Sequence, residues 1–450
     1  MKHRLVLVLT GAVGVLALVV SLSVAAAGTN GTRHMSARAA IAPPPVKNAA
    51  KIRAKYHGQK ITFVGDNAIG GSHKRDIALA ARFKKDTGIT VDVVPHPSES
   101  DASYSQLARN FASHSSAFDA MMIDVVWPGA FAKYLVDLKK PLATNAKRQA
   151  ASIIKNDTVH GHLVAMPWFG DFGILYYRTD LLRKYHFSHP PRTWKELGSM
   201  AKTIQTGERS SNKNFYGFVW QGNSYEGLTC DSLEWVASSN GGAFVRGKKA
   251  TINNSHAAGV LNLVRSWVGN IAPRGVTSYK EEDARNAFDA GNAAFMRNWP
   301  YAYSASQTTP VKGKFDVTVL PHGSGGHSVG TVGGWQVAIS KYSKHRGATI
   351  EWIRYITSPG VERYDAIFNS NVPTIPSVAL DPAVRRTNPY LKPSIAKVPR
   401  VTRPAGPLGT HYAQGSQYIY QAMNRIENGS DAKSVLPGLA SQLNRLLRRS

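Results

Sequence analysis

The chain is poor in cysteine and in acidic residues. Cys230 is the only cysteine among 450 residues, so no disulfide can form within the chain. It also lies far from the amino-terminal apolar segment, so we do not expect a lipoprotein. Asp and Glu total 28 against 55 Lys and Arg, which gives a formal net charge of +27. The apolar residues, 43% of the chain, must therefore supply the core that stabilises the fold.

Several catalytic and metal-binding motifs are absent. The sequence contains no H-E-x-x-H, no P-loop and no G-x-G-x-x-G, which argues against a zinc protease, a P-loop nucleotide site and a dinucleotide site. The pair His160 and His162 has no carboxylate or thiol cluster beside it in the sequence, so we predict no metal site there. No spacing indicates a carboxylate pair for glycoside hydrolysis, although such a pair stays open as an alternative.

One segment does match a catalytic pattern. Gly326 to Gly330 reads G-H-S-V-G and fits the nucleophile elbow of serine hydrolases. That elbow needs a strand before it and a helix after it, whereas glycine-rich LPHGSG precedes this segment and a predicted strand follows it. We therefore expect no enzyme, no metal and no cofactor, and a secreted hydrolase is the less favoured alternative.

The positive charge has no nucleic-acid signature to accompany it. A field of this sign attracts nucleic acid, anionic lipid or acidic polymers. Lys and Arg are nevertheless spread along the whole chain, without a zinc finger, a basic zipper or an aromatic ribonucleoprotein stretch. We expect no nucleic-acid function and interpret the charge as a surface suited to the compartment, for example an acidic medium.

The amino terminus has the pattern of an export signal. Lys2 and Arg4 precede a long apolar run, and small residues at 25–27 form an A-x-A cleavage site. The alternative is an uncleaved anchor, because residues 5–27 are long enough to cross a bilayer. Both interpretations place the rest of the chain outside the cytoplasm. Residues 28–57, which include three consecutive prolines, read as a flexible linker with nothing to bury.

Strands and helices then alternate. The first strands are predicted near 61–64 and at 89–96, and the nearly continuous apolar run AFDAMMIDVVWP is typical of a parallel strand buried on both faces. Helices are predicted between them, which indicates an α/β fold with a parallel sheet. The later part stays mixed and ends in two helices. The length favours two domains over one.

Aromatic and polar residues cluster at the ends of the predicted strands. The clusters are Asp124 with Trp127; Trp168 with Asp171; Tyr225 with Glu226; Trp299 with Tyr301 and Tyr303; and Gly333 and Gly334 with Trp335. Ligands of open α/β sheets bind beyond strand ends, and flat rings suit the apolar face of a sugar. Core packing explains any single ring equally well. The three rings of NWPYAYS are predicted to share one face of a strand in either case.

Eight segments together resemble a known family. Their order and spacing are similar to those of the extracellular solute-binding proteins of carbohydrate ABC transporters, especially the branch that binds trehalose and maltose, from about Lys60 to the carboxyl terminus. The segments are FDAMMIDVVWPGAF, GILYYRTDLLRKY, PPRTWKEL, FYGFVWQGNSYEGLTCDSLEW, GNAAFMRNWPYAY, PVKGKFDVTVLPH, GGWQVAISKYS and RVTRP.

The resemblance implies two α/β lobes that close on a ligand, each discontinuous in sequence. We expect residues 58–152 and 330–372 in one lobe, and residues 153–329 and 373–450 in the other. Matching sugar-contact positions are Asp171, Trp299, Tyr301, Gly333, Gly334, Trp335 and Arg403. Asp124, Trp127, Tyr225 and Glu226 lie in shared motifs and complete the predicted ligand-binding set.

Two departures from the family leave the particular sugar open. Relatives place an acidic residue where this chain has Ala117, and another in the loop after the first strand, where Asn67 to His73 contain no carboxylate. Asn67 or His73 is a hypothetical substitute. The resemblance implies a neutral di- or oligosaccharide ligand, a membrane permease as partner and a monomer. The alternatives within this fold are a polyol, a polyamine or an acidic sugar.

Overall fold

The computed structural model of the chain describes residues 41–67 and 72–449. The predicted signal or anchor at 1–27, and the first part of the predicted linker, lie outside the described residues. Within the described ranges, no helix combines the length and the apolar character that a membrane span requires.

The first part of the chain forms a parallel α/β unit. β1 (Lys60–Gly65) pairs in parallel with both β2 (Thr90–Pro95) and β3 (Ala120–Asp124). The helices α3 (Ser72–Thr87) and α4 (Ser100–Ala112) connect these strands in turn. All residues of β3 are buried, as its uninterrupted apolar sequence predicts for a central strand. The predicted fold class is confirmed in this region.

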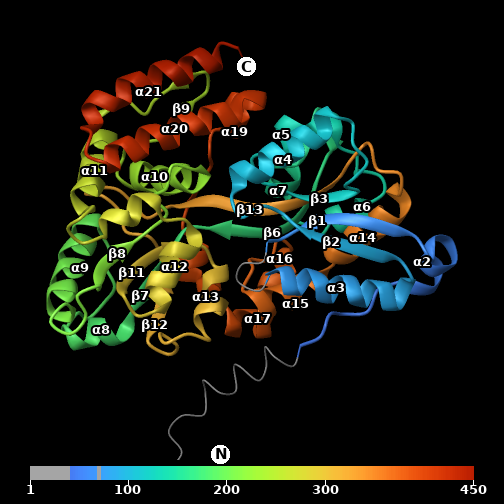
Figure 1. Cartoon of the computed structure of the whole chain (residues 1–450), viewed down its shortest axis with the longest axis horizontal. Helices are drawn as coiled ribbons and strands as arrows, with labels where there is room; N and C mark the ends of the chain where they lie inside the picture. Colours follow the sequence, from blue (N-terminus) through green and yellow to red (C-terminus); the bar gives the residue numbers. More distant parts are fainter. Residues whose placement is uncertain (1–40, 68–71, 450) are drawn as a thin grey trace, which may run out of the picture.

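A long later strand extends the same sheet. β13 (Gly330–Ile339) pairs antiparallel with β3 and with β6 (Met166–Phe172), and in parallel with the short β14 (Arg400–Val401). The sheet has the order β14-β13-β3-β1-β2, with β6 on β13. Figure 1 shows β13 running from one half of the molecule into the other. The register places Gly333 opposite Asp171, so two segments far apart in sequence meet here.

A second sheet has the order β12-β7-β11-β8. Its strands are β7 (Ile174–Arg178), β8 (Tyr216–Val219), β11 (Ala293–Asn298) and β12 (Phe315–Thr318). β11 is antiparallel to β7 and parallel to β8. We call the six-stranded sheet with its helices the first lobe, and the four-stranded sheet with its helices the second lobe.

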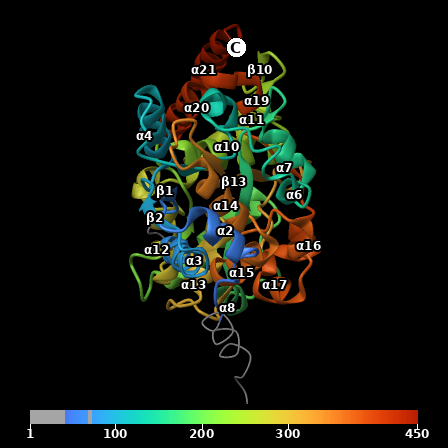
Figure 2. The same cartoon turned by 90° about the vertical axis from the view of Figure 1, so that its right-hand side faces the viewer.

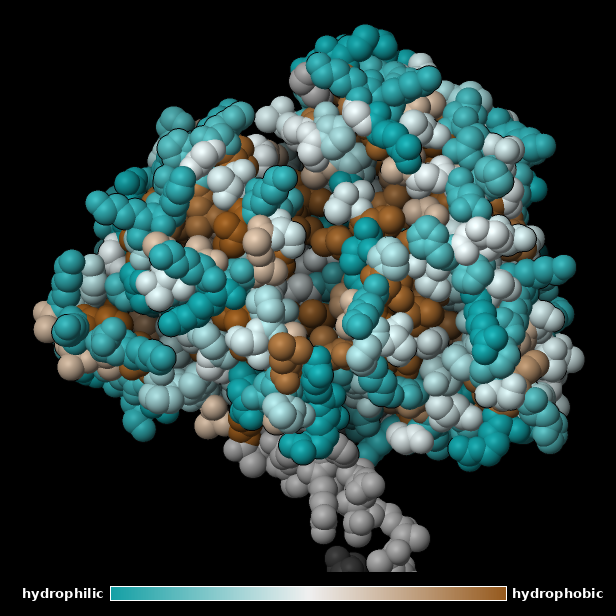
Figure 3. All heavy atoms as spheres, turned by 180° about the vertical axis from the view of Figure 1, so that it is seen from behind, coloured by the Kyte–Doolittle hydropathy of each residue, from teal (hydrophilic) through white to brown (hydrophobic). Residues whose placement is uncertain are grey.

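Helices and small hairpins surround the two sheets. Their bounds are α2 (Ala49–Tyr56), α5 (Pro128–Phe131), α6 (Ala143–Ala146), α7 (Ala151–Asn156), β4 (Thr158–Val159), β5 (His162–Leu163), α8 (Thr179–Lys184), α9 (Trp194–Glu208), α10 (Glu226–Ser238), β9 (Val245–Arg246), β10 (Lys249–Ala250), α11 (Ser255–Trp267), α12 (Glu281–Asp289), α13 (Tyr301–Ser306), α14 (Arg346–Ile356), α15 (Pro359–Asn369), α16 (Pro376–Ala379), α17 (Pro382–Thr387), α18 (Pro393–Ala396), α19 (Ala405–Leu408), α20 (Tyr412–Glu427) and α21 (Ala432–Leu447). Figures 1 and 2 show α20 and α21 packed beside α10 and α11, on the second lobe. On the face drawn in Figure 3, hydrophilic residues dominate and hydrophobic residues appear mainly in recesses.

The chain crosses between the lobes at β6. This strand pairs with β13 in the first sheet, whereas β7, which begins only two residues after β6 ends, belongs to the second sheet. The predicted boundary at 152 would place β6 in the second lobe. We propose that this boundary lies near Gly173 instead.

Two local predictions are wrong. Part of the predicted linker folds as α2, in which Ile52 is buried, and Val46 before it donates its N–H to Asp86 Oδ2 at 2.8 Å. The predicted strand through NWPYAYS ends at Asn298, and Tyr301 begins α13. Pro300 has φ −53 and no N–H, so it suits the start of a helix and cannot continue the β-ladder.

Candidate ligand-binding site

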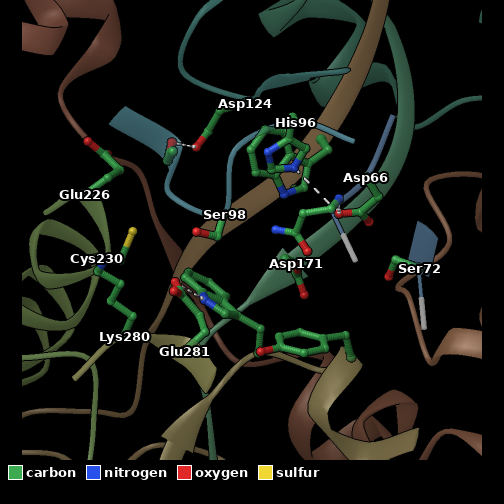
Figure 4. Close-up of a pocket in the computed structure, with 18 of the residues that line it drawn as sticks. Asp66, Ser72, His96, Ser98, Asp124, Asp171, Glu226, Cys230, Lys280 and Glu281 are labelled. Carbon is green, nitrogen blue, oxygen red and sulfur yellow. Dashed lines mark hydrogen bonds and ion pairs between the residues drawn. The ribbon is translucent and has the colours of Figure 1, made fainter. Parts of the chain in front are cut away.

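A cavity of about 390 Å³ lies between the two lobes, beyond the strand ends (Figure 4). Residues of both lobes line it: Asp66, Asn67, Ser72, His96, Ser98, Ser100, Asp124, Phe169, Asp171, Tyr225, Glu226, Gly227, Cys230, Lys280, Glu281, Glu282, Asp283, Trp299, Tyr301, Gly333, Gly334, Trp335, Asn371 and Arg403. Its size is within the range of small-molecule sites, which is about 300–1,000 Å³.

The structure places nearly all predicted residues at this cavity. Those that line it are Asp124, Asp171, Tyr225, Glu226, Trp299, Tyr301, Gly333, Gly334, Trp335 and Arg403. Trp127 lies outside the lining and is 3% exposed. Its ring meets Trp335 edge-on, with centroids 5.7 Å apart, so it supports Trp335 from behind.

Trp299 is held on one face and at its polar edge. The Arg297 guanidinium lies 3.9 Å from the ring centroid, and Nε1–H donates to Glu281 Oε1 at 3.4 Å. The outer edge of the indole comes close to the β13 backbone, where a Cβ on Gly333 would lie 3.0 Å from Trp299 Cζ3. Gly333 therefore permits the close approach of Trp299 to the strand, as a glycine does where ring and backbone meet.

Asp171 presents a buried carboxylate oxygen, Oδ1, that has no hydrogen-bond donor among residues 41–67 and 72–449. Figure 4 shows its side chain near the middle of the group of lining residues. Burial raises the pKa of Asp171 well above its ordinary value, while Arg297 acts in the opposite direction. A buried acceptor without a donor is costly, so a ligand hydroxyl placed here would satisfy it.

Arg403 bridges the two lobes. Its Nη2 donates to Asp124 Oδ1 at 2.7 Å, and its Nη1 to Glu226 Oε1 at 2.7 Å. Asp124 ends β3 of the first lobe and Glu226 begins α10 of the second. Both Nη groups of Arg403, a predicted sugar-contact residue, therefore bind protein carboxylates. Its buried Nε–H has no partner in the described structure.

Residues at the beginning of α4 make two further contacts with the second lobe. Glu99 Oε1 accepts from Lys280 Nζ at 2.6 Å, and Asp101 Oδ2 accepts from the backbone N–H of Glu226 at 3.2 Å. Burial and the Glu226 charge raise the pKa of Asp101 to about 7. These bonds join the lobes in the arrangement seen here.

His96 stacks against Trp335, with centroids 5.2 Å apart and an angle of 30°. Its Nδ1 lies 2.8 Å from the Ser103 hydroxyl, and its Nε2 lies 3.6 Å from Asp66 Oδ1. This Ser–His–Asp order resembles a hydrolase triad, but Ser103 is 2% exposed and does not line the cavity. A buried hydroxyl cannot reach a ligand, so the set orients the imidazole.

Charge in the cavity is opposite to that of the whole chain. The lining has seven carboxylates, which are Asp66, Asp124, Asp171, Glu226, Glu281, Glu282 and Asp283. The lining contains one lysine, Lys280, and one arginine, Arg403. The net positive charge of the chain therefore does not extend into this site.

Sequence reasoning missed four of the seven acidic side chains, which are Asp66, Glu281, Glu282 and Asp283. Glu281 and Glu282 open a helix, where acidic residues ordinarily serve the helix dipole, so no pattern marked them. Asp66 follows β1 and supplies a carboxylate to the cavity, while Ala117 is exposed and lies outside the lining. Asp66 directly precedes the segment from Asn67 to His73 in which the resemblance places the family's acid. His96, directly after β2, could have been found by the same strand-end rule.

The other predicted motifs lie apart from the cavity. His162 Nδ1 lies 2.8 Å from Asp137 Oδ2 on an exposed hairpin. Among residues 41–67 and 72–449, no group of three or more His, Cys, Asp and Glu side chains is placed to hold a metal ion. Gly330 of the G-x-S-x-G segment begins β13, so a strand follows the serine where the elbow needs a helix.

Comparison with known proteins identifies the family. The model of the bacterial extracellular solute-binding proteins matches residues 70–363, which is more than half of the chain. The chain belongs to this family. The two lobes with a cavity between them agree with that membership, and the resemblance found in the sequence is confirmed at this level.

Individual relatives agree over nearly the whole length. A probable ABC transporter-binding protein of Deinococcus radiodurans is 42% identical over 88% of this chain and 96% of its own length. A maltose-bound structure of T. maritima MalE3 is 33% identical, covers 86% of this chain and all of its own, and superimposes with a TM-score of 0.81. A ribitol-bound solute-binding protein of Agrobacterium radiobacter, 23% identical over 87% of this chain and 99% of its own with a TM-score of 0.74, shares the fold.

Proposed function

We propose that this chain is the exported receptor of an ABC importer, and that it binds a neutral disaccharide or short oligosaccharide between its lobes and delivers it to a membrane permease. The observation that supports this most is that the Trp299 ring and Asp171 line the same cavity, and that Asp171 Oδ1 has no donor among the described residues. The T. maritima relative is bound to maltose, which is a neutral disaccharide of the class proposed for this chain.

Each part of the cavity suits one part of a sugar. The faces of Trp299 and Tyr301 offer apolar area for the C–H face of a ring, as Trp335 does from the other lobe. Asp171 accepts from a hydroxyl, and Arg403 Nε–H donates to an oxygen. A trehalose- or maltose-sized ligand would contact both lobes at once.

The acidic lining argues against an acidic sugar. A carboxylate ligand would meet seven protein carboxylates, while Arg403 and Lys280 already pair with Glu226, Asp124 and Glu99. The same charges favour a second candidate, a polyamine, because ammonium groups pair with carboxylates and aromatic faces. Most of these carboxylates already accept protein hydrogen bonds, which leaves few for several ammonium groups.

Binding would act through the equilibrium between separated and closed lobes. A ligand that contacts both lobes shifts this equilibrium towards the closed form. The shift in free energy equals the difference between its binding free energies for the closed and the open form. The interlobe bonds of Arg403, Lys280 and Asp101 then add to the stability of the closed form. The permease would recognise the closed form.

A ligand screen tests the proposal. We expect maltose or trehalose to raise the melting temperature of the purified protein, and ribitol, spermidine and glucuronate to raise it less. Calorimetry with the best sugar should show binding that Trp299→Ala weakens strongly at unchanged fold. A larger shift with spermidine would favour the polyamine, and release of glucose from bound disaccharide would indicate an enzyme.

A further inference from the structure

The first turn of α12 holds the polar ends of three aromatic side chains in the cavity. Tyr225 donates its hydroxyl to Glu281 Oε2 at 2.6 Å, and Trp299 donates Nε1–H to Glu281 Oε1 at 3.4 Å. Tyr301 donates its hydroxyl to the next residue, Glu282, at 2.5 Å. Two consecutive carboxylates thus bind all three donors.

A side-chain hydrogen bond joins this turn to the end of β11, directly before Trp299. Asn298, the last residue of β11, donates Nδ2–H to the Glu281 carbonyl at 3.0 Å. Glu282 is itself held, because Arg285 one turn later donates Nε–H to its Oε2 at 3.0 Å. Both carboxylates therefore have restricted rotamers, as a supporting group must have if it is to orient a ring.

Because each carboxylate is held in place, its hydrogen bonds also restrict the aromatic side chains that donate to it. A phenol has two side-chain torsions, and a bond from its hydroxyl to a charged oxygen fixes the position of the hydroxyl end of the side chain. Trp299 is restricted on three sides, by Glu281 at Nε1, by Arg297 on one face and by Gly333 at its edge. Its other face is the surface available to a ligand.

We propose that Glu281 and Glu282 are positioning residues that orient the Trp299 ring and fix the hydroxyl ends of Tyr225 and Tyr301 for sugar binding. This inference rests on the proposed sugar-receptor function, but the hydrogen bonds that hold the rings join protein groups only. Lys280, which directly precedes them, pairs with Glu99 of the first lobe, so closing the lobes holds the same turn in place. Ring orientation and closure are thereby coupled.

The test compares removal of each acceptor with its conservative replacement. Glu281→Ala and Glu282→Ala remove the carboxylate. Glu281→Gln and Glu282→Gln keep one acceptor oxygen for Trp299 or Arg285, and their NH2 can donate to the tyrosine hydroxyl, which also accepts. Glu208→Ala is the matched control, because it removes a carboxylate that accepts from the Tyr185 hydroxyl at 2.8 Å outside the cavity lining.

The first readout uses no sugar. Protein labelled with 5-fluorotryptophan gives fluorine resonances, and the Trp299 signal is assigned by its loss in Trp299→Phe. We expect Glu281→Ala to shift or broaden this resonance in the ligand-free protein, Glu281→Gln to shift it much less, and Glu208→Ala to leave it unmoved. An unmoved resonance in Glu281→Ala would overturn the positioning role, because a residue that only contacts the ligand leaves the free protein unchanged.

The second readout is the affinity for maltose by calorimetry. We expect each alanine variant to bind about 10-fold or more weakly and each glutamine variant to stay within about threefold of the parent, in line with an orienting hydrogen bond. Alanine and glutamine variants that lose affinity equally would overturn the inference. If the parent binds no sugar, the proposed function fails, and the fluorine spectra still decide the positioning role.

Discussion

Each lobe contains a fully buried arginine packed on a tryptophan. In the first lobe Arg75 lies 4.2 Å from the centroid of Trp168, and in the second Arg297 lies 3.9 Å from that of Trp299. Arg75 pairs with Asp76 and Asp365, and Arg297 with Asp231 and Glu234. The local chemistry is the same in both lobes.

The two clusters differ in what covers the far face of the indole. Trp168 is 1% exposed and lies outside the cavity lining, with Phe63 and Phe169 packed against it. Its cluster reaches the cavity only through Phe169 and through Asp66, which pairs with Arg75 at 3.4 Å. Trp299 lines the cavity. The arginine and its carboxylates are buried to the same degree in both clusters. The clusters therefore differ in the exposure of the indole, and only an indole that faces the cavity can contact a ligand.

Removal of each arginine should have the largest effect. Arg75→Met and Arg297→Met leave buried carboxylates unpaired, so we expect each to lower the free energy of unfolding by about 3–5 kcal/mol. Only Arg297→Met should also weaken maltose binding strongly. Urea unfolding and calorimetry measure the two quantities. Arg363→Met, which breaks an exposed pair with Asp381, is the control and should cost less than about 1 kcal/mol. Equal loss of affinity in the Arg75 and Arg297 variants would break the comparison.

Removal of each tryptophan should separate stability from binding. Trp168→Ala leaves a cavity in the core and should cost about 3–5 kcal/mol of unfolding free energy. Trp299→Ala should cost less stability, because its ring is partly exposed, and should weaken maltose binding about 30-fold or more through lost stacking area. Trp299→Phe should recover part of that affinity. Weaker maltose binding by calorimetry, together with a near-native melting temperature of Trp299→Ala, would confirm the contrast. Unchanged affinity of Trp299→Ala for maltose would refute it.

A third buried arginine, Arg403, lies between the lobes, and its cluster should respond to pH. The pKa of Asp101 rises from 3.8 to about 7 in the folded protein. Between these values the folded state binds more protons than the unfolded one, so the free energy of unfolding should fall as pH rises from about 4 to 7. Asp101 is partly exposed, so we expect about 1–2 kcal/mol across this window.

Asp101→Asn tests that pH dependence. The amide cannot ionise, so the variant should be more stable than the parent at pH 7 and equal to it near pH 4. Urea unfolding at several pH values measures this. The side chains charged near Asp101 are Glu226, Asp124 and Arg403, and Tyr420 also faces it. An identical slope in parent and variant would assign the pH dependence to those groups instead.

The smallest effect should come from the backbone beside Trp299. In Gly333→Ala the new methyl would lie 3.0 Å from Trp299 Cζ3 and 3.1 Å from Asp171 Cβ. We expect the indole to move by a few tenths of an ångström, with a loss of affinity of about threefold and of stability below about 1 kcal/mol. Gly334→Ala should destabilise more, because φ is +116 and the methyl would lie 2.7 Å from the Phe169 carbonyl. The order of the two variants in thermal melting decides this prediction.

The sequence predicted the α/β class and ten of the cavity-lining residues from strand ends and motifs. Asp171, Trp299 and Trp335 were identifiable because rings and acids at the ends of strands face a crevice. Trp127 has the same sequence context and nevertheless packs behind Trp335, since its exposure depends on a ring that comes more than 200 residues later in the chain. Local pattern cannot tell these two outcomes apart.

What the sequence alone determined is therefore the set of buried faces and the chemical character of the strand ends, because apolar periodicity and proline or glycine positions act within a few residues. Only the tertiary structure decided that Glu281 and Glu282 support the cavity rings, that Arg403 is held by a carboxylate from each lobe, and that Lys280 meets Glu99. These contacts join residues up to 279 positions apart. The register of β13 against β3 and β6 likewise places Trp335 opposite Asp124 and Gly333 opposite Asp171.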